Sequence, residues 1–184
     1  EYCCWVKMDV LGLDNIGLIS KACKLAGLPF LTPNSTDIID FNDKKVWESM
    51  RKDNVGIFQF ESDRAAKILK ELFSRETIAK VEKKVPDFKY MDLLSLGNAA
   101  QRPGSASFVE QVIHGEFKDN GHPALNKFLA STQGFMVYQE QLIQFLVEFT
   151  GRTPGRADIL RRAVGHKIKD VIDREVPIIR QDFI

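Results

Sequence analysis

Positive charge is concentrated in one stretch of the sequence, Gly151–Lys169. It holds six lysines and arginines against one acid, Asp158, whereas the whole chain carries a net charge of only +1. The basic residues are Arg152, Arg156, Arg161, Arg162, Lys167 and Lys169. A guanidinium stays charged and can bind two phosphate oxygens at once, so the adjacent Arg161 and Arg162 could form a fixed fork for a phosphate group. The alternative is a solvated helix end, where cations complement the helix dipole.

A second pair of residues suited to chemistry lies near the beginning of the chain. The alternation of residues 5–10 predicts a β-strand with an apolar face and with Lys7 and Asp9 on the other face. Their side chains would leave the strand about 6.6 Å apart. A carboxylate binds a hard metal ion and an ammonium attracts phosphate, so the pair is typical of a metal–triphosphate site. A surface salt bridge on an edge strand is the alternative.

Helical periodicity predicts the elements that would position the basic residues. Pro154 suits the first turn of a helix, and Gly165 is suited to end it. Between them one apolar stripe can pack inward while the arginines project elsewhere, and it consists of Ala157, Leu160, Ala163 and Val164. The strongly apolar segment 142–149 just before this stretch predicts the central buried helix of the fold.

Further helices follow the predicted strand. Asp14 can cap a helix that runs to about Ala26, and its inner stripe would consist of Ile16, Ile19, Cys23 and Ala26. Asp43 and Ser62 are suited to cap two later helices. Gly134–Tyr138 reads as a short strand, and Gly56–Ser62 as a short strand or a turn. The fold class predicted is therefore mainly α, with one N-terminal strand and one or two short internal strands.

The composition narrows the class of protein. With 184 residues, 44% of them hydrophobic and 28% charged, the chain can bury a substantial core. A net charge of +1 does not indicate a generally basic nucleic-acid coat, so anion binding would depend on local clustering. No segment has the pattern of a membrane span or a signal peptide. Cys3, Cys4 and Cys23 lack the spacing of a metal site, which favours reduced thiols and a cytoplasmic protein.

Five motifs, in this order and spacing, resemble the C-family polymerases, the bacterial replicative DNA polymerase III alpha subunits. The motifs are Lys7-Met8-Asp9-Val10-Leu11-Gly12-Leu13, Gly56-Ile57-Phe58-Gln59-Phe60-Glu61-Ser62, Arg102-Pro103-Gly104, Tyr138-Gln139-Glu140-Gln141 and Leu160-Arg161-Arg162-Ala163-Val164-Gly165-His166-Lys167. The resemblance implies that residues 1–27 form the C-terminal edge of a palm domain. It also implies that residues 28–184 form a helical fingers domain, truncated at its C-terminal end.

The resemblance also implies roles for individual residues. Asp9 matches the last of three palm aspartates that hold two Mg²⁺ ions, and Lys7 matches a basic residue beside the incoming triphosphate. Arg161 and Arg162 match the fingers arginines that grip the triphosphate of the dNTP. Arg102 and Lys167 resemble further basic contributors near the nucleotide. Gln139, Glu140 and Gln141 match a motif of the fingers interior and are expected to be mainly structural.

The same resemblance implies the reaction and the partners. The activity is template-directed nucleotidyl transfer by a DNA-directed DNA polymerase, in which two metal ions assist phosphoryl transfer and fixed cations hold the phosphates. The partners implied are dNTP, primer-template DNA and, in the full protein, a sliding clamp and other replicase subunits. No membrane is involved.

The sequence departs from the family pattern in two motifs and lacks part of the expected site. His166-Lys167 stands where the family often has two lysines, and Ser105 stands where it often has proline, so the chain resembles a divergent member. The other two palm acids, an Asp-x-Asp pair, are absent. One carboxylate cannot hold two metal ions, so the isolated chain is expected not to polymerise. The alternative function is a non-catalytic helical module that binds DNA or protein.

Overall fold

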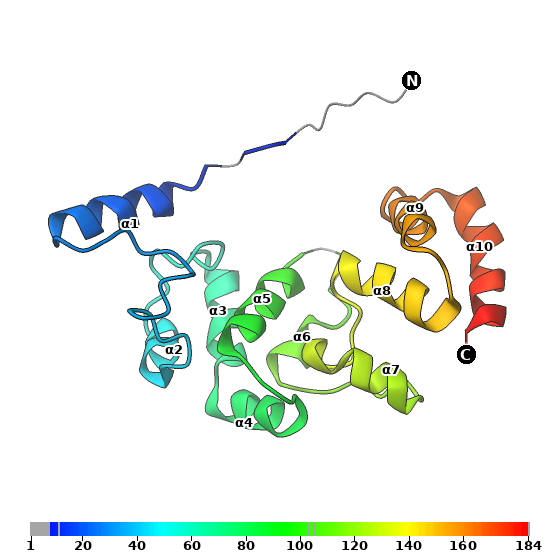
Figure 1. Ribbon diagram of the computed structural model, residues 1–184. Helices are drawn as coiled ribbons and strands as arrows, with labels where there is room; N and C mark the ends of the chain where they lie inside the picture. The colour runs from blue at the N-terminus through cyan, green and yellow to red at the C-terminus, as the bar shows by residue number, and fades with distance from the viewer. Residues whose placement is uncertain (1–7, 11, 103, 105, 184) are drawn as a thin grey trace.

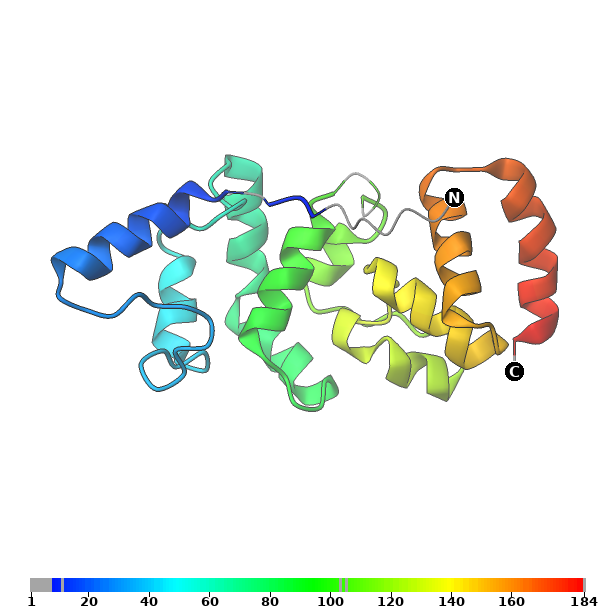
Figure 2. The ribbon, with the colours of Figure 1, turned by 45° about the horizontal axis from the view of Figure 1, so that its top comes forward.

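The computed structural model describes residues 8–10, 12–102, 104 and 106–183, and this part of the chain is mainly helical. The α-helices are α1 (Asp14–Leu25), α2 (Lys44–Met50), α3 (Asp63–Leu72), α4 (Arg75–Lys84), α5 (Tyr90–Ala100), α6 (Val109–Ile113), α7 (Pro123–Phe128), α8 (Gln139–Thr150), α9 (Pro154–Gly165) and α10 (Lys169–Asp182). A 3₁₀ turn, η2 (Ala130–Thr132), precedes α8. The helices form an elongated arrangement with α1 at one end and α9 and α10 at the other (Figures 1 and 2).

The larger hydrophobic core lies among α2, α3, α5 and α6. Its largest fully buried side chains include Phe60, Leu72, Phe73 and Leu96. The ring of Trp47 on α2 stacks on Phe73, with the ring centroids 5.5 Å apart. This core fixes the position of α5, whose C-terminal end leads to Arg102.

A second, smaller core joins α8, α9 and α10. Leu146 of α8 packs with Ala157 and Leu160 of α9, and half-buried side chains from α10 close the cluster. The apolar stripe predicted for the basic stretch is thus confirmed at Ala157, Leu160 and Ala163, which are buried, whereas Val164 is exposed. The packed stripe decides which side of α9 faces solvent.

The helix boundaries follow from local capping. The Asp43 side chain accepts a hydrogen bond from the backbone N–H of Lys45, and Ser62 accepts one from Ala65, as the sequence predicted. Thr153 caps α9, and Pro154 is its first residue, where the missing N–H costs no helical bond. The end of α9 differs from the prediction: the helix includes Gly165, and the left-handed residue of the turn is Lys167, with φ 54°.

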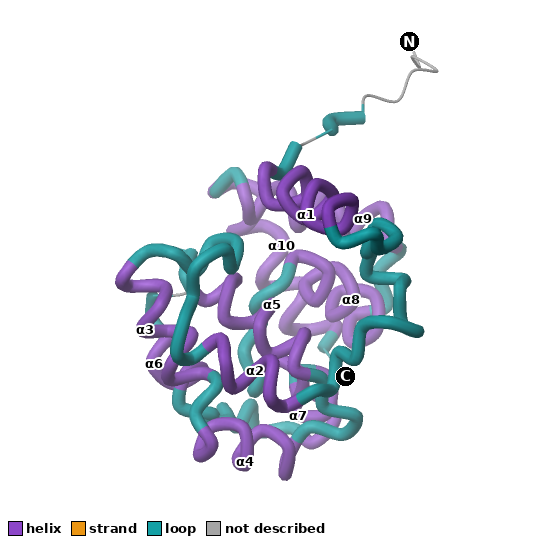
Figure 3. Tube along the Cα trace, turned by 90° about the vertical axis from the view of Figure 1, so that its left-hand side faces the viewer, coloured by secondary structure: helices purple, strands orange, loops and turns teal. Residues whose placement is uncertain are grey.

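The predicted internal strand is absent from the described residues, which contain helices and loops only (Figure 3). A strand needs a neighbouring strand to satisfy its backbone, and Gly134–Tyr138 finds its partners elsewhere. The N–H of Phe135 donates to the carbonyl of Thr132, and those of Val137 and Tyr138 donate to the side chain of Gln141. The prediction of a strand at this position is therefore wrong.

The other two segments predicted to be extended also differ from regular strands. Gly56–Ser62 forms turns, the second of the alternatives that its sequence left open, and the amide of Asn54 donates to the carbonyl of Phe60 within it. Half of the predicted N-terminal strand, residues 5–7, lies outside the described residues. The described residues 8–10 have no regular secondary structure.

Two predicted helices are less buried than their sequences suggest. On α1 only Cys23 is buried, and Ile16, Ile19 and Ala26 of the predicted inner stripe are exposed. In the apolar helix α8 the buried residues are Leu146 and Thr150, while the other apolar side chains are half-buried. None of the helices in the described residues is both long and apolar enough to span a membrane.

Candidate anion-binding site on α9

Arg161 and Arg162 share one counter-ion, Asp158, which lies one turn earlier on the same helix. The Nε atom of Arg161 is 2.9 Å from Oδ1 of Asp158, and the Nε atom of Arg162 is 2.9 Å from Oδ2. Spacings of three and four residues place all three side chains on one face of α9. The two guanidinium groups are thus held on a single carboxylate, and the trio keeps a net positive charge.

The carboxylate of Asp158 is stabilised in its charged form. The hydrogen bond from Arg161, followed by the hydrogen bond and charge of Arg162, holds the pKa of Asp158 below its ordinary value of 3.8, although partial burial opposes this. A hydrogen bond to the charged form of a carboxyl lowers its pKa because it disfavours protonation. Asp158 therefore remains an anion, and the arginines remain fixed to it, at all physiological pH values.

The two arginines differ in how firmly they are held. Arg161 has a second hydrogen bond, from Nη1 to Oε1 of Gln139 at 2.7 Å, and its side chain is 23% exposed. Among the described residues Arg162 is bound to Asp158 alone, and its side chain is 67% exposed. Arg161 is consequently the more ordered of the two, with one guanidinium nitrogen, Nη2, left for another acceptor.

The position of Gln139 depends on the loop that leads into α8. Gln139 is the first residue of α8, and the preceding loop is closed by Gln141. The Oε1 atom of Gln141 accepts from the N–H groups of Val137 and Tyr138 at 2.9 Å, and its Nε2 donates to Oγ1 of Thr132 at 2.8 Å. The structural role expected for this motif thus agrees with the contacts of Gln141, whereas Gln139 contacts a candidate site residue.

Arg102 lines a cavity that reaches Gln139. The cavity has a volume of about 700 Å³ and lies between the end of α5 and the beginning of α8. Its lining residues are Ser95, Asn98, Ala99, Arg102, Gly104, Phe108, Met136, Val137, Tyr138, Gln139 and Glu140. Volumes of 300–1,000 Å³ are typical of small-molecule sites. Gln139 both lines this cavity and binds Arg161, so it connects the cavity of Arg102 with the arginines of α9.

Tyr138 is the titratable aromatic residue of this cavity. Burial, followed by the nearby charge of Asp92, raises the pKa of its hydroxyl above the ordinary value of 10.0. Both causes disfavour the phenolate. Tyr138 is therefore a neutral hydrogen-bonding wall of the cavity at physiological pH.

Lys167 and Asp9 are both exposed. Lys167 is exposed in the turn after α9, and its N–H donates to the carbonyl of Val164. Asp9 is exposed and precedes α1. Lys7 lies outside the described residues.

The described residues do not assemble a metal site by themselves. In the described ranges, 8–10, 12–102, 104 and 106–183, no three His, Cys, Asp or Glu side chains gather where they could hold a metal ion. A two-metal site requires several carboxylates. A magnesium site that includes Asp9 would need acids from elsewhere.

Two other cations of the basic stretch have structural partners. Arg152, at the connection between α8 and α9, is buried and lies 3.2 Å from Asp182 of α10. Arg156 lies 3.3 Å from Glu175 of the same helix. The cluster of positive charge seen in the sequence is therefore divided: Arg152 and Arg156 bind α10, whereas Arg161 and Arg162 bind Asp158 on α9 itself.

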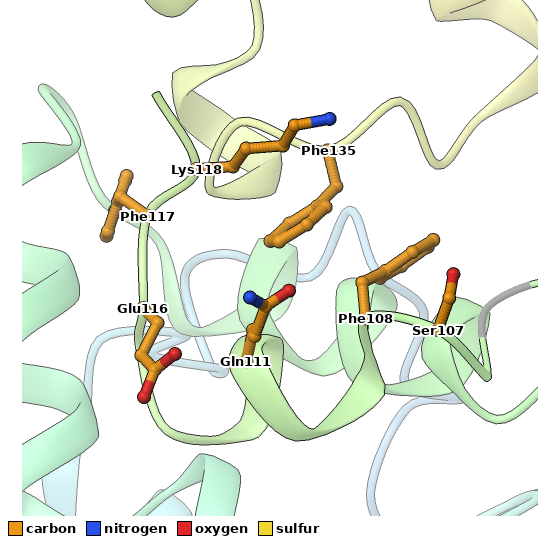
Figure 4. Close-up of a pocket in the computed structure, with 7 residues that line it drawn as sticks. All are labelled: Ser107, Phe108, Gln111, Glu116, Phe117, Lys118 and Phe135. Carbon is orange, nitrogen blue, oxygen red and sulfur yellow. The ribbon is translucent and has the colours of Figure 1, made fainter. Parts of the chain in front are cut away.

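A second cavity contains none of the predicted site residues. It has a volume of about 360 Å³ and lies beside the stacked rings of Phe108 and Phe135, whose centroids are 4.8 Å apart (Figure 4). Gln111 and Lys118 supply polar groups at its wall. Its charge is mixed, because Glu116 also lines it.

The sequence did not identify Asp158 and Gln139 as parts of the site. Asp158 could have been found, because an acid three and four residues before two arginines is a regular helical ion-pair pattern. Gln139 is 22 residues from Arg161 along the chain. Their contact depends on how α8 packs against α9, for which the sequence has no local signal.

Comparison with known proteins identifies the family. The model of the bacterial DNA polymerase III alpha subunit finger domain matches residues 15–183. The chain belongs to this finger-domain family. It is 32% identical to the DNA polymerase III subunit alpha of Halalkalibacterium halodurans over 167 residues, 88% of this chain and 14% of that protein.

Other DNA polymerase III alpha subunits agree with this membership. The protein from Treponema pallidum is 36% identical over 175 residues, 91% of this chain and 14% of the relative. The protein from Staphylococcus aureus is 33% identical over 184 residues, 97% of this chain and 16% of the relative. The resemblance read from the five motifs is thus confirmed. The finger domain spans 14–16% of the length of these relatives.

Proposed function

We propose that this chain is the fingers part of a DNA-directed DNA polymerase and that Arg161 and Arg162 bind the triphosphate of the incoming dNTP. The observation that carries the proposal is the pair of guanidinium groups held by Asp158 on the solvent side of α9. Fixed cations stabilise phosphate charge without having to be ordered when the nucleotide binds. We propose two further phosphate contacts. Arg102 lines the same cavity as Gln139, and Lys167 lies in the turn after α9.

The remaining parts of the reaction are divided between this chain and the rest of a longer protein. We assign residues 1–27 to the edge of the palm and residues 28–184 to the fingers. Asp9 would supply one ligand to a two-Mg²⁺ site, and Lys7 would lie beside the triphosphate. The other acids, most contacts to primer-template DNA and the binding of a sliding clamp and other replicase subunits would belong to the remaining protein, which would act in the cytoplasm.

The dNTP-binding proposal is tested with the full-length protein that contains this chain. Arg161→Ala combined with Arg162→Ala is expected to weaken dATP binding by about tenfold or more, because hydrogen bonds to charged groups contribute about 1.5–3 kcal/mol each. Lys83→Ala combined with Lys84→Ala is the matched control, since it removes the same charge from an exposed part of α4. Equal dATP affinity of the arginine double variant and the wild type would contradict the proposal.

A second experiment addresses catalysis by the isolated chain. We expect no Mg²⁺-dependent primer extension by residues 1–184 alone, because one palm carboxylate cannot hold two metal ions. Incorporation of nucleotides by the isolated chain would overturn this expectation. A non-catalytic module would instead show binding of DNA or protein with no specific affinity for dNTP.

A further inference from the structure

Gln139 makes a hydrogen bond to Arg161 that the packing of α8 on α9 does not require. Its Oε1 atom accepts a hydrogen bond from Nη1 of Arg161 at 2.7 Å, across the junction between α8 and α9. The helices are already packed through Leu146, Ala157 and Leu160 in the second core. An exposed side-chain hydrogen bond adds little to such packing, so its main effect is on the conformation of Arg161.

The geometry leaves Arg161 with a defined orientation. Asp158 binds its Nε from one side and Gln139 binds its Nη1 from another, so the guanidinium plane is fixed by two separate partners. Within the described part of the chain, Arg162 is paired with Asp158 alone, and its side chain is much more exposed. An arginine ordered before the ligand arrives loses less side-chain entropy on binding.

Gln139 is also suited to orienting Arg161 because its side chain is neutral. A carboxylate at this position would hold the arginine but would repel a phosphate, as Asp158 already does. A neutral amide oxygen orients the guanidinium and leaves its full positive charge for the ligand. The same side chain lines the cavity of Arg102, so it lies at the border between that cavity and the arginine.

We infer that Gln139 is a positioning residue for nucleotide binding: it holds Arg161 in the orientation in which the guanidinium receives a phosphate. This inference rests on the proposed triphosphate site and adds a residue to it. It also assigns different roles to the two arginines: Arg161 is oriented by two partners, whereas Arg162, which is 67% exposed, is held by Asp158 and contributes mainly its charge.

The test is the full-length polymerase with Gln139→Met, which keeps the length of the side chain and removes the acceptor. In primer extension with saturating primer-template, kcat/KM for dNTP is expected to fall about two- to tenfold, the range set by the loss of order in one long side chain. Gln144→Met is the matched control. Gln144 lies on the same helix and donates to Glu148 at 2.7 Å, but it contacts no arginine in the described structure.

A double-mutant cycle separates positioning from a merely structural role. In an Arg161→Ala background, Gln139→Met should have almost no further effect, whereas in an Arg162→Ala background its effect should persist. An equal effect in both backgrounds, or none in the wild type, would overturn the inference. If Arg161→Ala itself leaves kcat/KM unchanged, the triphosphate site fails as well; if it lowers kcat/KM but Gln139→Met does not, only the inference about Gln139 fails.

Discussion

Glu175 of α10 lies with its carboxylate 3.9 Å from the guanidinium of Arg152, and both side chains are buried, at 3% and 8% exposure. Arg152 follows the left-handed residue Gly151, which ends α8. The pair therefore connects the C-terminal helix to the junction between α8 and α9. Since the candidate arginines lie on α9, this buried contact helps to determine the position of the helix that carries them.

Removal of the Glu175 carboxylate is expected to destabilise the chain strongly. Glu175→Ala removes one of the two acids beside the buried guanidinium of Arg152, and Asp182 remains 3.2 Å away. We expect a loss of about 2–3 kcal/mol, less than for a buried charge left with no partner. Arg174→Ala is the control, because Arg174 is 66% exposed and its pair with Glu175 should contribute at most about 1 kcal/mol. Urea unfolding of each variant gives the two changes in the free energy of unfolding. Similar values for the two variants would contradict a structural role for the buried pair.

A substitution at Gly134 should disturb the loop that positions Gln139. Gly134 has φ +85°, and an added Cβ atom would collide with the backbone carbonyl of Lys118. The left-handed backbone costs a residue with a Cβ atom about 1–2 kcal/mol, and the collision adds a packing cost. Together they predict that Gly134→Ala lowers the free energy of unfolding by about 2–5 kcal/mol. Gly17→Ala in α1 is the control: a Cβ atom there meets nothing within 4 Å, and alanine favours a helix by about 0.5–1 kcal/mol. A neutral Gly134→Ala variant would show that the loop can rearrange.

The two arginines should contribute unequally to nucleotide affinity. Arg161 has two hydrogen-bond partners and is mostly covered, whereas Arg162 is held only by Asp158 and is solvent-exposed. We therefore expect Arg161→Ala to weaken dATP binding about tenfold or more and Arg162→Ala about two- to fivefold. Titration calorimetry of the two single variants of the full-length protein measures the difference. A larger loss in Arg162→Ala would reverse the proposed roles.

The ion pairs of Asp158 should give a specific dependence of stability on pH. The folded-state pKa of Asp158 lies below its ordinary value of 3.8, first because of the hydrogen bond from Arg161. Its contribution is therefore fully present above pH 3.8 and is lost as the pH falls through the folded-state pKa. The stability difference between wild type and Asp158→Asn should accordingly shrink in acid, which urea unfolding at pH 6 and at a series of pH values below 4 would show. A difference that stays constant over this range would exclude a lowered pKa.

Local sequence patterns were sufficient for much of the helical structure. Asp43 and Ser62 cap their helices as predicted, and Pro154 begins α9, because capping depends on residues only two or three positions apart. The buried stripe of α9 also followed from the sequence, since helical periodicity fixes which residues share a face. These features in turn determined that Arg162 projects into solvent, whereas Arg161 lies beside the buried stripe and is 23% exposed.

Patterns that need a distant partner were predicted less well. Residues 134–138 were predicted to form a short strand, but the N–H of Phe135 bonds to Thr132 and those of Val137 and Tyr138 bond to the side chain of Gln141. The periodicity of α1 predicted a buried stripe, yet Ile16 and Ile19 are exposed. A periodic sequence shows which residues can be buried together; whether they are depends on the element that packs on them.

The sequence by itself determined the helical class, the family motifs and the two adjacent arginines, because each depends on residue type and short-range spacing. The tertiary structure decided which partners the basic residues of Gly151–Lys169 contact. Packing of α10 assigns Arg152 to Glu175 and Asp182, and packing of α8 brings Gln139 to Arg161. These contacts join residues 22 to 30 positions apart, so only the folded chain could distinguish the arginine that is oriented for a ligand from the one that stabilises the fold.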